Sequence, residues 1–226
     1  MGRHLLWALL LAPWTGFADP IILVPPGLLP GDHYRLVFVT ASTTDAISTS
    51  IADYDTFVNN EANDPLSLLL PLGVTWTAIG STSTVAAYDH IGGVFSTPIY
   101  RLDGALVAIG SAGLWDGSLD APIRYSQFGT DVDSLVWTGS AENDGSIHSC
   151  SLGSSYSCGV VGLSGTATND WLAYWLESPL SVPHPLYGIS PDLTVPGSGV
   201  PEPGTVSMML MGAMLVLLTK RYLRIP

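Results

Sequence analysis

The chain contains two cysteines, Cys150 and Cys158, and their thiols have the widest range of chemistry of any side chains in it. Their Cys-x7-Cys spacing lies in a segment rich in serine and glycine, where an exported protein forms a local disulfide. A metal site would need further soft ligands, and only His148 is near in sequence. A nucleophilic cysteine would need a base and an orienting group that the sequence does not identify. We therefore predict a Cys150–Cys158 disulfide.

Two loops rich in oxygen donors, at residues 114–120 and 143–145, form a second group of candidates. Carboxylate and amide oxygens are hard ligands that suit Ca²⁺. Neither loop completes an EF-hand, and ordinary turns capped by Asp or Asn side chains explain the same pattern. No cofactor is required, and Ca²⁺ is an optional one. The residues predicted to contact a ligand are Trp115, Asp116, Asp120, Asn143 and Asp144.

Catalytic motifs are missing from the sequence. The histidines between residues 19 and 200 lack His-x3-His or His-Glu-x2-His spacing. The segment 153–157 approaches a Gly-x-Ser-x-Gly elbow, but Ser157 stands in place of the second glycine. No lysine lies between residues 19 and 200, which excludes a phosphate-binding glycine loop of the lysine-containing type. We predict that the protein is not an enzyme. A secreted hydrolase whose site is assembled from distant residues remains an alternative.

The charge of the central region excludes one class of partner. Between Asp19 and Asp192 there are 18 acidic and three basic residues, a net charge of −15. Such a surface repels phosphate backbones, so nucleic acid is not an expected partner. The acidity keeps an exported protein soluble, or it attracts divalent cations.

The C-terminus combines three kinds of segment. Val200, Pro201, Glu202, Pro203 and Gly204 form an extended segment, because proline breaks secondary structure. An uncharged apolar run of 13 residues follows, from Val206 to Leu218. As a helix it spans only about 20 Å, less than the hydrocarbon core of a bilayer, which argues against a simple membrane anchor. The basic residues Lys220, Arg221 and Arg224 end the chain and favour the cytoplasmic side.

This tripartite ending resembles the PEP-CTERM sorting signal of Gram-negative bacteria. The resemblance implies that an exosortase-type membrane peptidase recognises the Pro-Glu-Pro segment and processes the tail. It also implies an intermediate tethered to the inner membrane, followed by delivery to the cell surface or the extracellular matrix.

The N-terminus predicts export as well. Arg3 precedes a short apolar stretch, and small residues at Gly16 and Ala18 mark a cleavage site for signal peptidase. We therefore predict a signal peptide at residues 1–18, an exported domain at 19–195, a Pro/Gly linker with the PEP motif at 196–204, and a hydrophobic helix with a basic tail at 205–226.

Within the exported domain the patterns predict short strands and one good helix. The helix is expected at residues 51–63 with Ser50 as its N-cap. A hairpin is expected around Asp103-Gly104, which suits a two-residue turn. Further strands are expected at residues 34–40, 74–79, 134–138, 186–190 and 193–195. The segments 111–133 and 140–169 are expected to be loops in which little requires burial.

The order of several short motifs resembles an uncharacterised bacterial exported domain that is similar to the C-type-lectin-like and endostatin-like fold. The motifs are Leu36-Val37-Phe38-Val39-Thr40, Trp76-Thr77-Ala78, Leu102-Asp103-Gly104, the run from Leu114 to Ile123, and Val136-Trp137-Thr138-Gly139. The resemblance covers residues 32–192 and implies a single strand-rich, long-loop α+β domain. The sequence departs from the C-type-lectin-like domains in one respect, because its two cysteines cannot form the long-range disulfides that are common there.

These observations predict a non-catalytic surface or extracellular-matrix protein. The expected partners are the sorting peptidase, signal peptidase, and an exopolysaccharide or envelope glycan. A calcium-assisted carbohydrate-binding module is the main alternative.

Overall fold

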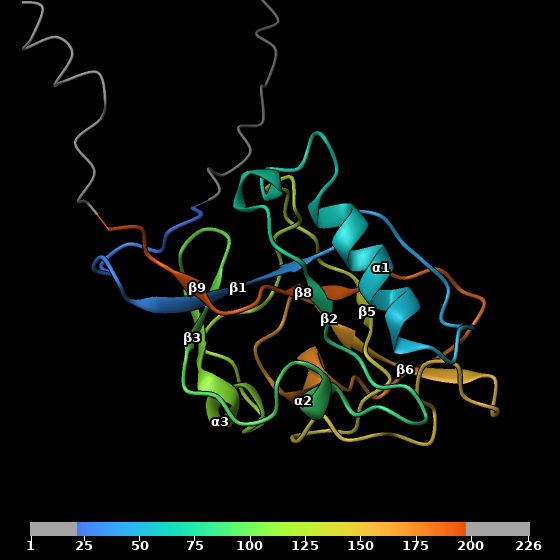
Figure 1. The fold of residues 1–226 in the computed structure, drawn as a ribbon. Helices are drawn as coiled ribbons and strands as arrows, with labels where there is room; N and C mark the ends of the chain where they lie inside the picture. The colour runs from blue at the N-terminus through green and yellow to red at the C-terminus, as the bar shows by residue number, and fades with distance from the viewer. Residues whose placement is uncertain (1–21, 198–226) are drawn as a thin grey trace, which may run out of the picture.

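The computed structural model describes residues 22–197, which form an α+β fold of short strands and long loops (Figure 1). The predicted signal peptide and the sorting residues 200–226 lie outside the described part of the chain. None of the helices between residues 22 and 197 has the length and apolar character that a membrane span requires. In chain order the elements are β1 (His33–Val39), α1 (Ile51–Ala62), η1 (Leu70–Leu72), β2 (Thr77–Ala78), α2 (Ala87–His90), β3 (Pro98–Arg101), β4 (Leu106–Ile109), α3 (Gly110–Leu114), β5 (Leu135–Trp137), β6 (Cys158–Leu163), η2 (Asn169–Trp171), β7 (Glu177–Pro179), β8 (Tyr187–Ile189) and β9 (Leu193–Thr194).

In the larger sheet the first strand, β1, pairs with the last two, β8 and β9. Its strands lie in the order β2-β8-β1-β3-β4, and β9 pairs with β1 off this path. β1 is antiparallel to β8 and β9 and parallel to β3. The backbone of Gly31 and that of Asp32 add hydrogen bonds to Val195, at 3.0 and 2.8 Å. The described chain therefore begins and ends on the same side of the molecule (Figure 1).

The last four residues of β1 are buried on both faces, which explains their continuous apolar sequence. Successive residues of a strand point to opposite faces. Leu36 and Phe38 accordingly join one core, whereas Val37 and Val39 join a second core on the other face. The strands predicted at residues 34–40, 134–138, 186–190 and 193–195 all form: the first is shifted by one residue, and the other three are one or two residues shorter than predicted. In the predicted strand 74–79 only Thr77 and Ala78 pair.

Helix α1 confirms the predicted helix, but its cap differs from the prediction. Tyr54, Val58 and Ala62 form the buried stripe that faces the first core. Ser50 occupies the N-cap position without a side-chain capping bond. The Ser48 hydroxyl instead donates to the Asp53 carboxylate at 2.5 Å and accepts the Ser50 N–H at 3.1 Å. The start of α1 is therefore stabilised by Ser48, in the turn that precedes the helix, and not by a capping bond from Ser50.

The predicted β3–β4 hairpin forms, but its turn is not the two-residue one expected at Asp103-Gly104: the Gly104 N–H donates to the Arg101 carbonyl at 2.9 Å, so the turn is centred on Leu102 and Asp103. Gly104 has a φ of 85°, a conformation that glycine adopts without cost. The Arg101 N–H donates to the Ala105 carbonyl at 2.8 Å and closes the turn. Burial alone would raise the pKa of Asp103, but hydrogen bonds from Arg101 and from the Ala105 N–H outweigh it and lower that pKa.

A second sheet, in the order β5-β6-β7, contains a strand that the sequence analysis placed in a loop. The expectation that little in residues 140–169 requires burial is wrong, because the four central residues of β6 are buried. The Cys150–Cys158 disulfide is confirmed and links the start of β6 to the preceding loop. The Val160 N–H donates to the Cys150 carbonyl at 2.8 Å and holds the same two segments together.

Candidate functional site

Three loops meet around the indole of Trp115. A Cβ atom on Gly145 would lie 2.6 Å from this ring, so Gly145 must be glycine for the loop to approach so closely. The Trp171 ring lies 5.8 Å away and the Tyr88 ring 6.3 Å away, between centroids. Trp115 is only 7% exposed. The Trp115 ring is therefore mostly enclosed by these loops, and the ligand contact expected of it stays a prediction.

The loop around Gly117 gathers two amide oxygens. A Cβ atom on Gly117 would lie 2.7 Å from the Oδ1 atoms of both Asn143 and Asn169. Asn143 has a φ of 69°, in the left-handed region where Asn is more readily accommodated than most residues. Asn143 is one of the contact residues predicted from the sequence, whereas Asn169 is not. The structure brings the two side chains together from loops that are far apart in sequence.

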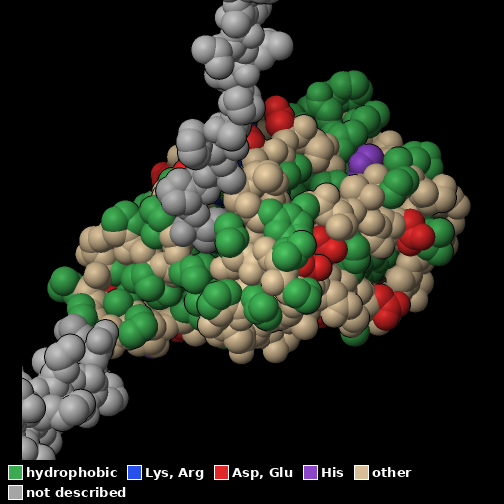
Figure 2. All heavy atoms as spheres, turned by 90° about the horizontal axis from the view of Figure 1, so that it is seen from above, with side chains coloured by type: hydrophobic (Ala, Val, Ile, Leu, Met, Phe, Trp, Pro, Cys, Tyr) green, Lys and Arg blue, Asp and Glu red, His purple; other side chains and the backbone are tan. Residues whose placement is uncertain are grey.

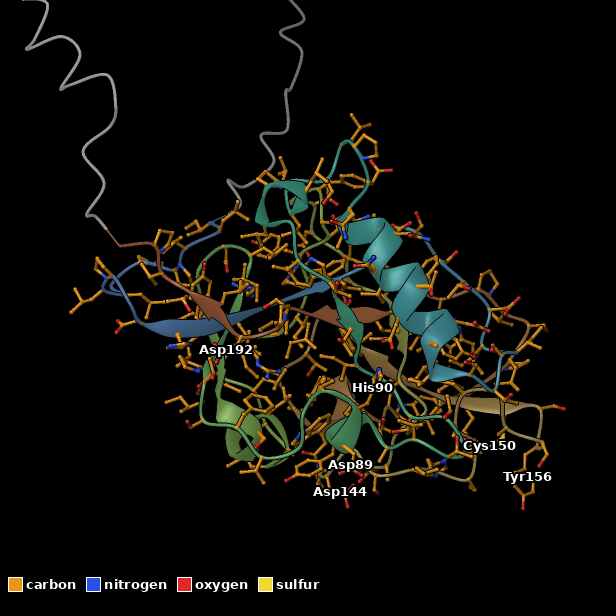
Figure 3. All side chains as sticks on the ribbon, in the orientation of Figure 1. Asp89, His90, Asp144, Cys150, Tyr156 and Asp192 are labelled. Atoms are coloured by element: carbon orange, nitrogen blue, oxygen red, sulfur yellow. A yellow bond between two sulfur atoms is a disulfide. The ribbon has the colours of Figure 1, made fainter. Side chains whose placement is uncertain are left out.

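A pocket of about 310 Å³ opens beside these loops. Its lining residues are Ala86, Tyr88, Asp89, Asp144 and Ser146. Figure 3 shows Asp89 and Asp144 close together in the view, at the end of the molecule where α2 lies. Tyr88 is half-buried, and both carboxylates are exposed. The pocket therefore offers one aromatic ring, two acceptors of hydrogen bonds and a serine hydroxyl.

Hydrogen bonds tie the short helix α2 to the loop that carries Asp144. The Tyr88 N–H donates to the Gly145 carbonyl at 3.3 Å. The buried Ser81 hydroxyl accepts the Ala87 N–H at 2.9 Å and lies 2.8 Å from the Ser140 hydroxyl. These bonds join both walls of the pocket to the body of the protein. Tyr88 and Asp89 give no signal in the sequence, because a four-residue helix carries no periodic pattern.

The predicted carboxylates do not form one cluster. Asp116 Oδ1 accepts the Ser118 N–H at 3.0 Å, and Asp144 Oδ1 accepts the Ser146 N–H at 2.9 Å. These are the turn-stabilising bonds that the simpler interpretation predicts. Asp120 is exposed and does not line the pocket. Between residues 22 and 197 the one group of three acidic, His or Cys side chains at ligand distance is His148, Cys150 and Glu177. A calcium site in the loops around Gly117 would therefore need the amide oxygens of Asn143 and Asn169 as well as a carboxylate.

A serine–histidine pair bears on the hydrolase alternative. Ser178 Oγ lies 2.9 Å from His184 Nε2, and the His184 ring packs edge-on against Trp137. Ser178 is 6% exposed and lies within β7. Among the described residues no carboxylate pairs with His184. A triad needs such a group to orient the base. The Ser178–His184 bond links β7 to the segment that precedes β8, where the His184 ring packs against Trp137.

His184 should make stability depend on pH. Burial lowers the pKa of His184 below its ordinary value of 6.5. On acidification the unfolded chain takes up a proton at this residue before the folded chain does. The free energy of unfolding should therefore fall as the pH drops from about 7 toward the folded-state pKa. Urea unfolding at several pH values should show a shallower acid loss in His184→Gln than in the wild type. If the free energy of unfolding fell equally with acid in the wild type and in His184→Gln, the pH dependence could not be assigned to His184.

Neither the protein-family models nor the curated proteins with which the sequence was compared gave a match. A proposal for the function therefore rests on the arrangement of the residues in the structure and on the sequence patterns at the two ends.

Proposed function

We propose that the protein is a non-catalytic, exported surface or extracellular-matrix protein that binds a polysaccharide in the Tyr88–Asp89–Asp144 pocket. The pocket itself carries the proposal. A sugar ring presents apolar C–H faces and a rim of hydroxyl groups. The Tyr88 ring suits the first, and the Asp89 and Asp144 carboxylates accept hydrogen bonds from the second. Its volume of about 310 Å³ falls within the range of small-molecule sites.

The charge of the protein favours neutral glycans over acidic ones. The region from Asp19 to Asp192 has a net charge of −15. On the face seen in Figure 2, acidic side chains are scattered among polar and apolar ones instead of forming a single patch. A polyanionic glycan would meet repulsion at the two pocket carboxylates unless a divalent cation bridged them. Neutral exopolysaccharide or envelope glycan is the proposed ligand.

The two ends of the sequence support the proposed location. The apolar stretch before Ala18 supports cleavage by signal peptidase, and the Pro201-Glu202-Pro203 segment supports recognition by an exosortase-type peptidase. The apolar run and basic tail would hold an intermediate at the inner membrane. The processed protein would then reach the cell surface or the matrix.

A C-type-lectin-like fold is the finer structural proposal. The strand-rich α+β arrangement supports it, as do the long loops that build the pocket. In Figure 1 those loops lie at a distance from the place where the first and last described residues are joined through β1 and β9.

Calcium-assisted binding is a second candidate, supported by the two amide oxygens beside Gly117. Asn143 and Asn169 converge there, and Asp116 and Asp144 are neighbours in sequence of Gly117 and Asn143. Amide and carboxylate oxygens of this kind suit Ca²⁺. The ion would fix the loops that form the pocket wall.

A glycan array, probed with and without a calcium chelator, separates the two candidates. We expect binding to neutral glycans that persists in chelator, and bound oligosaccharides recovered at their original length. Binding that disappears in chelator would favour the calcium-assisted module. Shortened oligosaccharides would overturn the non-catalytic assignment.

A further inference from the structure

A group of metal-ligating side chains lies at the disulfide, apart from the Tyr88 pocket. The ligand atoms of His148, Cys150 and Glu177 all lie within 4.8 Å of one another. The Cys158 sulfur is not one of these three atoms, but it is bonded to that of Cys150 and so lies beside the group. Figure 3 shows Cys150 clear of Asp89 and Asp144. Nothing in the proposed polysaccharide function uses these four side chains.

We propose that reduction of the Cys150–Cys158 disulfide creates a site for Zn²⁺, with Cys150, Cys158, His148 and Glu177 as its ligands. Two thiolates, one imidazole and one carboxylate are a donor set that zinc binds tetrahedrally. Zinc–sulfur bonds of about 2.3 Å would hold the two sulfurs about 3.7 Å apart. The S–S bond therefore excludes the ion. The disulfide and the metal site are alternative states of the same residues.

The scaffold that gathers the ligands does not depend on the S–S bond. In the β6–β7 ladder Cys158 lies opposite Pro179, and Val160 lies opposite Glu177. The bond from the Val160 N–H to the Cys150 carbonyl, at 2.8 Å, fastens the loop to this ladder. Cys150, Val160 and Ala173 also form a small buried cluster. These contacts keep both sulfurs and the Glu177 carboxylate in one place after reduction.

Zinc binding would have to change the hydrogen bonding or the protonation of the His148 ring. Its Nδ1 accepts the Cys150 N–H at 3.1 Å, so the proton of the neutral ring is on Nε2. Zinc would replace that hydrogen bond at Nδ1, or it would bind Nε2 while Nδ1 takes the proton. Glu177 is exposed and His148 is half-buried, whereas Cys150 is buried. An ion would therefore enter from the Glu177 side.

The redox step is balanced with a phosphine reductant. The phosphine is oxidised to its oxide with oxygen from water, and its two electrons break the S–S bond. The two sulfurs take up two protons from that water and become thiols. Zn²⁺ then displaces both thiol protons and forms two Zn–S bonds, so binding releases protons to solvent. A dithiol reductant would supply the same two electrons by disulfide exchange.

Cobalt(II) titration of the full-length protein, held in mild detergent with the phosphine, tests the proposal. Co²⁺ serves as a coloured substitute for Zn²⁺. The reduced protein should show a thiolate-to-cobalt charge-transfer band and the visible bands of tetrahedral cobalt, and Zn²⁺ should abolish both. The oxidised protein should show neither. His148→Ala and Glu177→Gln should each weaken binding by about tenfold or more. Glu142→Gln removes an acid from the neighbouring loop and should bind as the wild type does.

Two results would overturn the proposal. One is a reduced, folded protein without the charge-transfer band. The other is unchanged affinity in both His148→Ala and Glu177→Gln, which would leave only adventitious binding by two thiols. If reduction unfolds the protein, Zn²⁺ should restore the folded population, and failure to do so would equally count against the site.

Discussion

Protein recovered from the cell surface should lack every residue downstream of the 200–204 segment. We propose that the Pro-Glu-Pro motif, the apolar run to Leu218 and the terminal cations together make the tail a substrate for a membrane peptidase. Because cleavage removes the anchor, the effect on location is all or none. Mass spectrometry of the surface fraction should find peptides up to this segment and none from Lys220 onward.

A variant with Pro201→Ala and Pro203→Ala provides the matched test of recognition. It keeps the apolar run and the cations, so it should stay in the membrane fraction with its C-terminus intact. Intact Lys220–Pro226 in fully exported wild-type protein would instead show that the tail is a plain anchor.

Gly162→Ala should destabilise the protein more than any conservative change on its surface. A Cβ atom at Gly162 would lie 1.9 Å from the Trp171 carbonyl oxygen and 2.6 Å from its carbonyl carbon. Both are backbone atoms, so no side-chain rotation relieves the clash. Overpacking of a core costs about 1–3 kcal/mol, and this case belongs at or above the upper end. Urea unfolding should show a clearly lower midpoint.

Gly113→Ala is the control for this change. Its Cβ atom would lie 3.6 Å from the Ala108 side chain, an ordinary contact. Gly113 lies in α3, where alanine is favoured over glycine by about 0.5–1 kcal/mol. The control should therefore be as stable as the wild type or slightly more stable. A Gly162→Ala protein with the wild-type midpoint would refute the close approach of residue 171 to β6.

The elements that were predictable are those with a local signal. β1 has an unbroken apolar and β-branched run, α1 has a stripe at helical spacing, and Asp103-Gly104 marks the hairpin. β6 was missed because Gly159 and Gly162 make its sequence resemble the neighbouring loops. Those glycines are there because Trp137 and the Trp171 backbone pack against the strand. This packing exists only in the folded protein, so the sequence does not reveal why the glycines are there.

The candidate site was predictable in part. The sequence indicated Asp144 and Asn143 by their oxygen-rich turn, and the structure places Asp144 in the pocket and Asn143 beside Gly117. Tyr88 and Asp89 carried no signal, because their position depends on hydrogen bonds from α2 to Gly145 and Ser81. The burial of Trp115 arises from packing among three loops. Composition alone cannot predict it.

The affinity of an Asp89→Asn and Asp144→Asn double variant for the producer's own exopolysaccharide tests the central claim most directly. Asparagine keeps the size of each side chain, and at residue 144 it can still accept the Ser146 N–H. Hydrogen bonds to charged groups contribute about 1.5–3 kcal/mol and those to neutral groups about 0.5–1.5 kcal/mol, so replacing both carboxylates by amides should weaken binding about 30-fold or more. The double variant Asp45→Asn and Asp120→Asn makes the same charge change at exposed residues outside the pocket lining, and Asp45 caps a similar turn at Ile47. We expect a large loss of affinity in the first variant and wild-type binding in the second, with both melting cooperatively. Equal affinity in the wild type and the Asp89→Asn and Asp144→Asn protein would contradict it.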